Sequence, residues 1–288
     1  MPVNAKPESM KAIVIALFFL SNSCFGQYWM LEVQAGGAAY NGDLTQSRFS
    51  FNRLGPSVNL NFKYNTNDFL ILRAGAGWGT LMASDKDNKH GSLNTRNLDF
   101  KTNLLEFTVC AEMNLCDPEI FTSYPYMMLG LGLFHFDPFT YDKNGNKTYL
   151  KPLSTEGQGL PEYPDRKEYA LTQFCIPFGA GWKWRLKKDW ELSVEFAYRV
   201  TFTDYLDDVS KTYVDPEILS SHKGQLAAEL SYRKENKPFN ELGENRGNDD
   251  VKDLYYFTGL KLSVPLRNKK KEADRKKTPV PITPQTSG

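Results

Sequence analysis

The sequence predicts an all-β protein, an eight-stranded antiparallel up-and-down transmembrane β-barrel with short periplasmic turns and long extracellular loops. Apolar and polar residues alternate over segments longer than ten residues, whereas strands of soluble proteins usually have about five or six. A tilted strand needs about 9–11 residues to cross a bilayer. Very short and much longer connections also alternate along the chain, as they do in outer-membrane barrels.

The composition excludes several other classes of protein. Its 35 basic and 34 acidic residues leave a formal net charge of +1, which does not indicate nucleic-acid binding. The mean hydropathy is −0.49, and the longest apolar run, Ala12–Leu20, is about half as long as a membrane-spanning helix requires. A barrel remains possible because its inward-facing residues are polar.

Residues 1–26 are predicted to be a signal peptide. Lys11 supplies the positive charge, Ala12–Leu20 the apolar region, and the small and polar residues up to Gly26 lead to cleavage before Gln27. Met10 is a candidate true start, which would make residues 1–9 an upstream extension. Lipoprotein processing at Cys24 is an alternative, although the usual Leu three residues earlier is missing.

The first three strands are predicted over Tyr28–Tyr40, Leu54–Tyr64 and Asp68–Trp78. From Val58 onward every second residue of the second strand is apolar, and the residues between are Ser, Asn or Lys. Only three residues join the second strand to the third, whereas the first and second are separated by a long loop. The second and third strands are therefore predicted to form a tight hairpin.

Two further strands are expected in the middle of the chain. Leu105–Asn114 alternates strictly, and Pro125–Phe136 follows after the connection Leu115–Tyr124. The preceding segment Gly79–Thr102 is predicted to be a loop. Glycines within the strands are expected to mark bends or close backbone approach.

The last three strands are predicted over Thr172–Leu186, Trp190–Thr203 and Leu254–Leu266. Residues 75–78 and 179–182 share the sequence Gly-Ala-Gly-Trp, and a glycine-rich nucleotide-binding loop is one alternative. Such loops require a following helix, whereas strand-like alternation continues here through Trp184. The glycines are therefore interpreted as parts of strands.

Charges of both signs lie on the polar faces of these strands. Eight strands enclose a space just wide enough for side chains to fill, and a buried charge needs an opposite charge. We therefore expect a filled interior held by ion pairs, with no open pore; a catalytic or ion-conducting role for the charges is the alternative. The expected network contains Glu106, Glu112, Lys183, Arg185, Glu191, Glu195 and Arg199, with Glu32, Arg73 and Lys261 on the same faces.

Aromatic residues near the strand ends predict two membrane-interface belts. One belt would contain Trp29, Trp184 and Trp190, and the other Tyr40, Trp78, Phe136, Phe174 and Phe202. Three cysteines would remain after signal cleavage, an odd number that argues against a disulfide framework. Cys110 and Cys175 are expected to be buried thiols on inward positions, and Cys116 to lie in a turn.

Two loop segments carry distinctive motifs. The first is Thr155, Glu156, Gly157, Gln158 and Gly159, and the second is Phe202, Thr203, Asp204, Tyr205, Leu206, Asp207 and Asp208, followed by Val209 and Ser210. The three aspartates could offer oxygens to a hard cation such as calcium, although their spacing does not match a calcium loop and turn formation is the alternative. Leu219–Arg233 is expected to be a short helix lying in or over the last loop.

These motifs, with Ile-Pro-Phe-Gly at residues 176–179, resemble the PorG-type outer-membrane barrels of Bacteroidetes over residues 27–266. The resemblance implies a non-enzymatic component of the type IX protein secretion system, which also serves gliding motility in some species. It implies association with the periplasmic ring of the lipoprotein PorK and of PorN. No cofactor, metal or small-molecule substrate is implied, and the lipid of the outer membrane is the expected surrounding.

The expected partner surface lies at the short turns. It comprises the connections Asn65–Asn67, Leu115–Tyr124 and Lys187–Asp189, and the individual candidates are Asn65, Thr66, Asn67, Cys116, Asp117, Lys187, Lys188 and Asp189. The strongly basic segment 267–288 is predicted to be a disordered periplasmic tail that could dock on an acidic partner.

Two rival functions remain open from sequence. An outer-membrane enzyme acting on lipid or peptide would need a nucleophile and a base near the outer rim, and of His90, His135 and His222 only His135 lies on a predicted strand. A soluble lipocalin-like carrier would place its apolar residues inside, and alternation alone does not reveal which face is outside.

Overall fold

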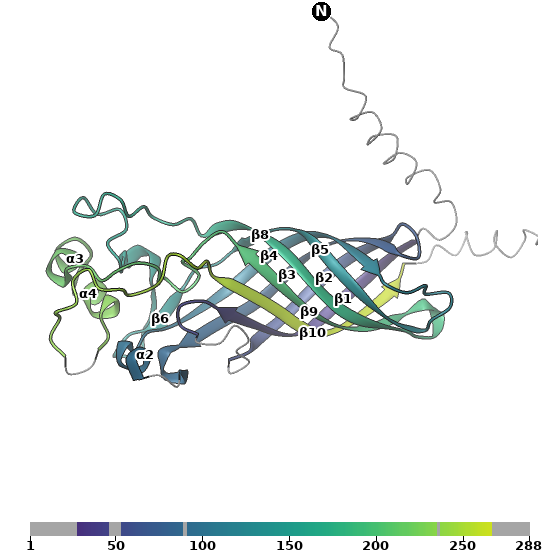
Figure 1. Ribbon diagram of the computed structural model, residues 1–288, viewed down its shortest axis with the longest axis horizontal. Coiled ribbons are helices and arrows are strands. Elements are labelled where there is room, and N and C mark those ends of the chain that lie inside the picture. The colour runs from purple at the N-terminus through teal and green to yellow at the C-terminus, as the bar shows by residue number, and fades with distance from the viewer. Residues whose placement is uncertain (1–27, 46–52, 89–90, 235–236, 267–288) are drawn as a thin grey trace, which may run out of the picture.

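A computed structural model describes residues 28–45, 53–88, 91–234 and 237–266 of the chain. Within these residues eight long antiparallel strands form a closed barrel, because β1 pairs with β10 and β3 pairs with β4 (Figure 1). The predicted eight-stranded barrel is confirmed. Its strands are β1 (Tyr28–Asn41), β2 (Gly55–Asn65), β3 (Leu70–Ser84), β4 (Asp99–Asn114), β5 (Ser123–His135), β8 (Thr172–Arg185), β9 (Glu191–Thr201) and β10 (Leu254–Pro265).

The two faces of the wall differ sharply. Successive residues of a strand point to opposite faces, so β4 alternates between exposed Leu105, Phe107 and Val109 and buried Glu106 and Thr108. The same alternation holds around the barrel, with apolar residues outside and polar or charged residues inside. A soluble lipid or ligand carrier has the reverse arrangement, which argues against that alternative.

The barrel has a turn end and a loop end. The turn end carries the connections 66–69, 115–122 and 186–190, of which the last contains η3 (Lys187–Asp189). The loop end carries 42–54, 85–98, 136–171 and 202–253. The predicted loop Gly79–Thr102 was too long, because β3 and β4 remain paired as far as Ser84 and Asp99.

The described residues of the four long connections form a structured unit, called the cap below (Figure 1). Instead of the single expected helix Leu219–Arg233, the structure has two short helices over 216–223 and 225–231, separated at Gly224, where φ is +88°. Asp215 caps the first of them by accepting from the backbone N–H of Glu217. The cap elements are η1 (Asp85–Asp87), α2 (Gly91–Arg96), β6 (Phe139–Tyr141), β7 (Lys147–Tyr149), η2 (Lys151–Leu153), α3 (Pro216–Lys223) and α4 (Gln225–Ser231).

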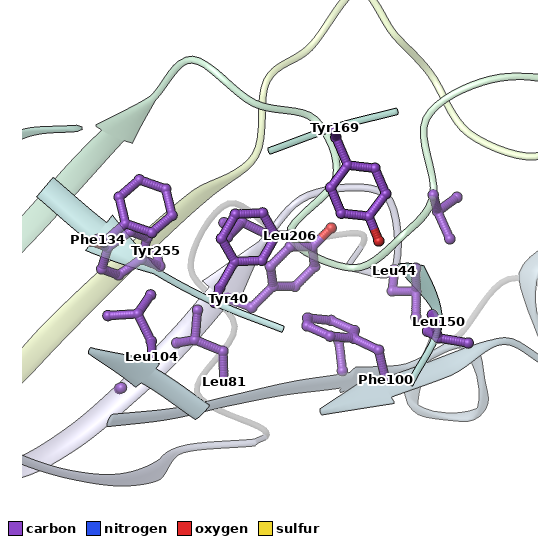
Figure 2. Close-up of a cluster of buried hydrophobic side chains, with 14 of the residues drawn as sticks. Tyr40, Leu44, Leu81, Phe100, Leu104, Phe134, Leu150, Tyr169, Leu206 and Tyr255 are labelled. Atoms are coloured by element: carbon purple, nitrogen blue, oxygen red, sulfur yellow. The ribbon is translucent and has the colours of Figure 1, made fainter. Parts of the chain in front are cut away.

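The main hydrophobic core lies where the cap meets the barrel mouth (Figure 2). Aromatic side chains of the strand ends pack there against leucines of the loops, and the ring centroids of Tyr40 and Phe100 are 4.8 Å apart. Tyr40 and Phe136 were predicted in a membrane belt, but both point inward and are fully buried. Trp78, Phe174 and Phe202 of the same predicted belt are exposed.

Close backbone approach explains the glycines of the wall. Gly36 faces Gly259 across β1 and β10, and a Cβ atom on Gly36 would lie 2.0 Å from the carbonyl oxygen of Thr258. Both Gly-Ala-Gly-Trp segments lie inside strands, in agreement with the interpretation given above. No helix in the described part of the chain is long and apolar enough to cross a membrane. The predicted signal peptide and basic tail lie outside the described residues.

Candidate functional site

The barrel interior contains a continuous ion-pair network. Glu112 lies at its centre, with one carboxylate oxygen 2.8 Å from Arg73 Nη1 and the other 2.8 Å from Lys183 Nζ. Lys261 Nζ lies 2.9 Å from Glu32 and 2.8 Å from Glu195. All six side chains are almost completely buried, so their charges are neutralised mainly by one another.

Two further pairs extend this network along the barrel. Lys63 Nζ lies 3.0 Å from Glu191 near the turn end, and Arg199 Nη2 lies 2.6 Å from Glu106 below the cap. The buried interior therefore holds five carboxylates (Glu32, Glu106, Glu112, Glu191 and Glu195) and five cations (Lys63, Arg73, Lys183, Arg199 and Lys261). Their charges balance, and their side chains fill the lumen.

The structure differs from the expected network at two positions. Arg185 is only half-buried and lies at the turn end, where it forms no ion pair with a described residue. Lys63 was missed as a member, although it continues the polar face of its strand beyond Asn59 and Asn61. The period-two pattern alone could have identified it.

The two loop motifs contact each other inside the cap. Thr155 donates a hydrogen bond from its hydroxyl to Asp208, across 53 residues of sequence, and the Tyr169 hydroxyl donates to the other oxygen of Asp208 at 2.7 Å. Gly157 and Gly159 both have φ of +75°, a conformation that favours glycine. The first motif is therefore shaped to pack against the second.

Glu156 and Arg246 join these segments to the last connection. The Glu156 carboxylate accepts from the backbone N–H groups of Ser210 and Lys211, each at 3.0 Å, and from Arg246 Nη1 at 3.0 Å. Arg246 also donates to the carbonyl oxygens of Asp208 and Ser231. Because these groups are buried, the motif residues hold the cap together from within.

A tyrosine and two aspartates form a second buried cluster. The Tyr40 hydroxyl lies 2.5 Å from an oxygen of Asp207 and 2.8 Å from one of Asp253. The hydroxyl has one proton, so it can donate to only one of these carboxyl groups at a time. Burial raises the pKa of both Asp207 and Asp253 well above the usual range, and the negative charge of Asp253 adds to this effect at Asp207, as that of Asp204 does at Asp253.

Asp204 lies beside this cluster with only 4% of its surface exposed. Neither of its carboxylate oxygens makes a hydrogen bond within the described residues, although the Ser210 side chain lies near enough to favour the charged form. Burial raises the pKa of Asp204 to about 7, and the charge of Asp43 adds to this effect. Burial also raises the pKa of Asp208 to about 6, against the opposing charge of Arg246. Burial therefore raises the pKa of four aspartates of the cap: Asp204, Asp207, Asp208 and Asp253.

The three aspartates of the second motif do not converge on a common point. Asp208 faces Thr155 and Tyr169, Asp207 faces Tyr40, and Asp204 has no hydrogen-bonding partner among the described residues. No group of three or more acidic, histidine or cysteine side chains in the described ranges is arranged to hold a metal ion. The arrangement favours the turn-forming interpretation over a calcium site.

The turn end brings the predicted partner surface together. The backbone N–H of Asn114 donates to the carbonyl of Phe69, and that of Arg185 donates to the carbonyl of Thr122, which link the three turns. Asn67, Lys187 and Lys188 are exposed, Thr66, Cys116, Asp117 and Asp189 are partly exposed, and Asn65 is buried within the barrel. Within the predicted segment Leu115–Tyr124, the apolar side chains of Ile120 and Phe121 are 72% and 50% exposed.

The histidines form no hydrolytic arrangement within the described residues. His135 lies exposed on the outer face of β5 and contacts the Thr172 hydroxyl at 3.0 Å, without a carboxylate to orient its ring. His222 pairs with Glu162 on the cap surface at 3.0 Å, and His90 lies outside the described residues. Cys110 and Cys175 are buried inside the barrel as free thiols, and Cys116 lies in a turn.

Residues 9–229 match the model of a family described as a domain of unknown function, DUF6089. No protein of the curated set matches the chain.

Three solved barrels illustrate the structural likeness. Neisserial surface protein A is 11% identical with a TM-score of 0.41, over 83% of this chain and 98% of that one. A major outer membrane protein from Thermus thermophilus is 11% identical with a TM-score of 0.40, over 83% and 99% of the two chains. Ail of Yersinia pestis is 10% identical with a TM-score of 0.38, over 83% and 100%. Identities this low, with TM-scores below 0.5, carry no argument about function.

Proposed function

The chain belongs to the DUF6089 family, and we propose that it is an integral outer-membrane barrel that serves the type IX secretion system without enzymatic activity. In this proposal the turn end faces the periplasm and contacts the ring of PorK and PorN, and the cap faces the cell exterior. The alternatives are an outer-membrane enzyme and a structural barrel of the same family with no secretion role.

The apolar outer wall is the observation that carries the membrane assignment. Leu131 and Val109 are 69% and 64% exposed in the middle of their strands, where water contact would be costly but lipid contact is favourable. Exposed Trp29, Trp184 and Trp190 lie toward the turn end, where aromatic residues of a membrane barrel meet the lipid headgroups.

The two loop motifs support the secretion assignment through their resemblance to PorG-type barrels. Most of their residues are buried and bond to one another, so they account for a shared cap structure and leave the partner contact to another surface. The turn end offers such a surface, because Ile120 and Phe121 are exposed beside the cationic turn of Lys187 and Lys188. An apolar centre beside charged residues is typical of a protein interface.

A cross-linking experiment in the native outer membrane tests this proposal. A photoreactive amino acid would replace Phe121 in one strain and Lys167 of the cap in another, followed by mild-detergent purification and mass spectrometry. We expect the ring proteins PorK and PorN to be cross-linked from position 121 and not from 167. A barrel recovered without them, from cells with assembled secretion machinery, would favour the structural alternative.

A further inference from the structure

The hairpin of β6 and β7 continues the lipid-facing wall beyond the end of the barrel. Lys101 of β4 pairs with Phe139 of β6, and Phe139 pairs with Tyr149 of β7. Side chains directly opposite each other in a ladder lie on the same face, and so do residues two apart in a strand. Lys101, Phe139, Tyr141, Lys147 and Tyr149 therefore share the face that carries Asn103, Leu105 and Phe107 further along β4.

This face has the composition of a rim between lipid and water. Lys147 Nζ lies 3.9 Å above the centre of the Phe139 ring and 4.5 Å from that of Tyr149, and Lys101 Nζ lies 5.5 Å from that of Tyr141. Both tyrosines are more than 40% exposed. The lysines are held by aromatic rings and form no salt bridge with a carboxylate of the described residues. Their positive charges are therefore available to another molecule.

Further basic groups surround these lysines. Burial raises the pKa of Asp137, whereas the nearby charges of His135, Lys147 and Lys151 lower it, which places three basic side chains around one half-buried carboxylate. Lys151 has an exposed partner in Glu168 at 3.6 Å. Three lysines, Lys101, Lys147 and Lys151, therefore lie near the carboxylates of Asp137 and Glu168, and Lys101 and Lys147 form no carboxylate salt bridge within the described residues.

The height of the rim matches the headgroup layer. Leu105 of β4 pairs with Trp78 of β3, and Trp78 marks the level at which the exposed aromatic residues of the loop end begin. Lys101 lies four residues from Leu105 along β4, toward the cap. Four residues span roughly 13 Å of strand, or about 10 Å along the membrane normal at the usual tilt. Figure 1 shows β6 at the loop end of the barrel.

We propose that Lys101 and Lys147, on their aromatic platform, bind a phosphate group of a phosphorylated glycolipid in the outer leaflet. This proposal rests on the membrane orientation proposed above. The surface continues the lipid-facing wall, so the acyl chains of the glycolipid would lie against Leu105 and Phe107. The two ammonium groups would then meet its phosphate, and the exposed Tyr141 and Tyr149 would contact its sugar rings.

Native mass spectrometry of the purified full chain tests the proposal. The protein would be titrated in detergent micelles with bisphosphorylated lipid A and with the same lipid lacking both phosphates. We expect the phosphorylated form to bind on the order of tenfold more tightly, because two charge-assisted contacts are lost without phosphate. Equal retention of the two lipids would overturn the proposal.

Matched variants locate the site. Lys101→Gln with Lys147→Gln should remove the preference for phosphate, and the corresponding double Arg variant should keep it. Lys187→Gln with Lys188→Gln removes the same charge at the opposite end and should leave binding unchanged. Equal losses in the two Gln pairs would show non-specific attraction and contradict the assignment.

A separate measurement distinguishes failure of the proposed lipid site from failure of the proposed outer-membrane location. Insertion of each variant into vesicles would be followed by heat-modifiable gel mobility. Normal insertion without phosphate preference would overturn the lipid site alone, and failure of the unaltered chain to insert would contradict the proposed location.

Discussion

The barrel and the cap bury their carboxylates in two different ways. Inside the barrel five buried carboxylates face five buried cations. In the cap the buried carboxylates are Asp85, Glu156, Asp204, Asp207, Asp208 and Asp253, and the buried cations among the described residues are Arg96 and Arg246. The barrel neutralises its acids with opposite charges, whereas the cap has fewer buried cations than buried acids, and burial raises the pKa of four of its aspartates.

This difference has a structural origin. Barrel strands place residues from neighbouring strands at fixed spacing, so long Lys and Arg side chains can reach several glutamates at once. Cap residues lie on loops whose short Asp side chains bond to nearby backbone N–H groups, as Asp207 does to Val209 and Asp253 to Leu206. The barrel network should therefore tolerate changes of pH near neutrality better than the cap.

The substitution Glu112→Gln should have the largest effect on stability. It removes the charge that faces Arg73 and Lys183 at 2.8 Å, and two further lysines lie within 3.5 Å. Breaking a buried ion pair by removing one partner costs about 3–5 kcal/mol. Urea unfolding of the protein in vesicles, followed by heat-modifiable mobility, would measure the loss. Glu119→Gln, on an exposed turn, is the control and should behave like the unaltered chain.

The substitution Arg246→Met should loosen the cap and leave the barrel intact. Arg246 donates to Glu156, to the Asp208 carbonyl and to the Ser231 carbonyl, and these acceptors would lose a buried donor. We expect a local loss of about 2–3 kcal/mol, because unsatisfied buried acceptors are costly. Limited proteolysis should cut the cap loops faster in this variant. All five Trp residues lie in or beside barrel strands, so their fluorescence should not change; a changed spectrum would mean that cap and barrel unfold together.

Raising the pH from 5 to 8 should destabilise the cap relative to the barrel. Burial raises the pKa of Asp204 to about 7 and that of Asp208 to about 6, while an unfolded Asp titrates near 4. The folded cap then holds protons that the unfolded chain releases, so the stabilising effect of protonation is present below pH 4. It is lost as the pH rises from 4 to 7.

Hydrogen exchange measured by mass spectrometry, corrected for the pH dependence of intrinsic exchange, would compare cap and barrel peptides at the two pH values. Asp204→Asn removes one of the titrating groups and should flatten the response of the cap. A cap that is equally protected at pH 5 and 8, or better protected at pH 8, would contradict the proton-based account.

Much of the barrel could be predicted from sequence because period-two alternation is a local property. Two local signals in the sequence were missed. Tyr40 lies an even number of residues after Glu32 in the same strand, so both side chains point inward. Asn144-Gly145 is a strong hairpin signal, and Gly145, with φ of +82°, ends the turn between β6 and β7.

The cap could not be predicted to the same degree. Tyr40, Asp207 and Asp253 meet across 167 and 213 residues of sequence, and no local pattern relates them. Likewise, the two loop motifs could be recognised as distinctive, but their mutual contact depends on the closure of the barrel beneath them. The sequence also does not show which face of the alternating strands is outside, because this follows only from the closure of the barrel.

The smallest effect is expected at an exposed ion pair of the cap. Lys211 Nζ lies 2.9 Å from Asp249, almost as close as Arg73 lies to Glu112, but the two side chains are 36% and 54% exposed. Water already solvates both charges, and such pairs contribute about 0–0.5 kcal/mol. Lys211→Gln should therefore leave cap hydrogen exchange within error at pH 5 and at pH 8. A loss as large as that of Glu112→Gln would show that distance, and not burial, governs the strength of ion pairs in this protein.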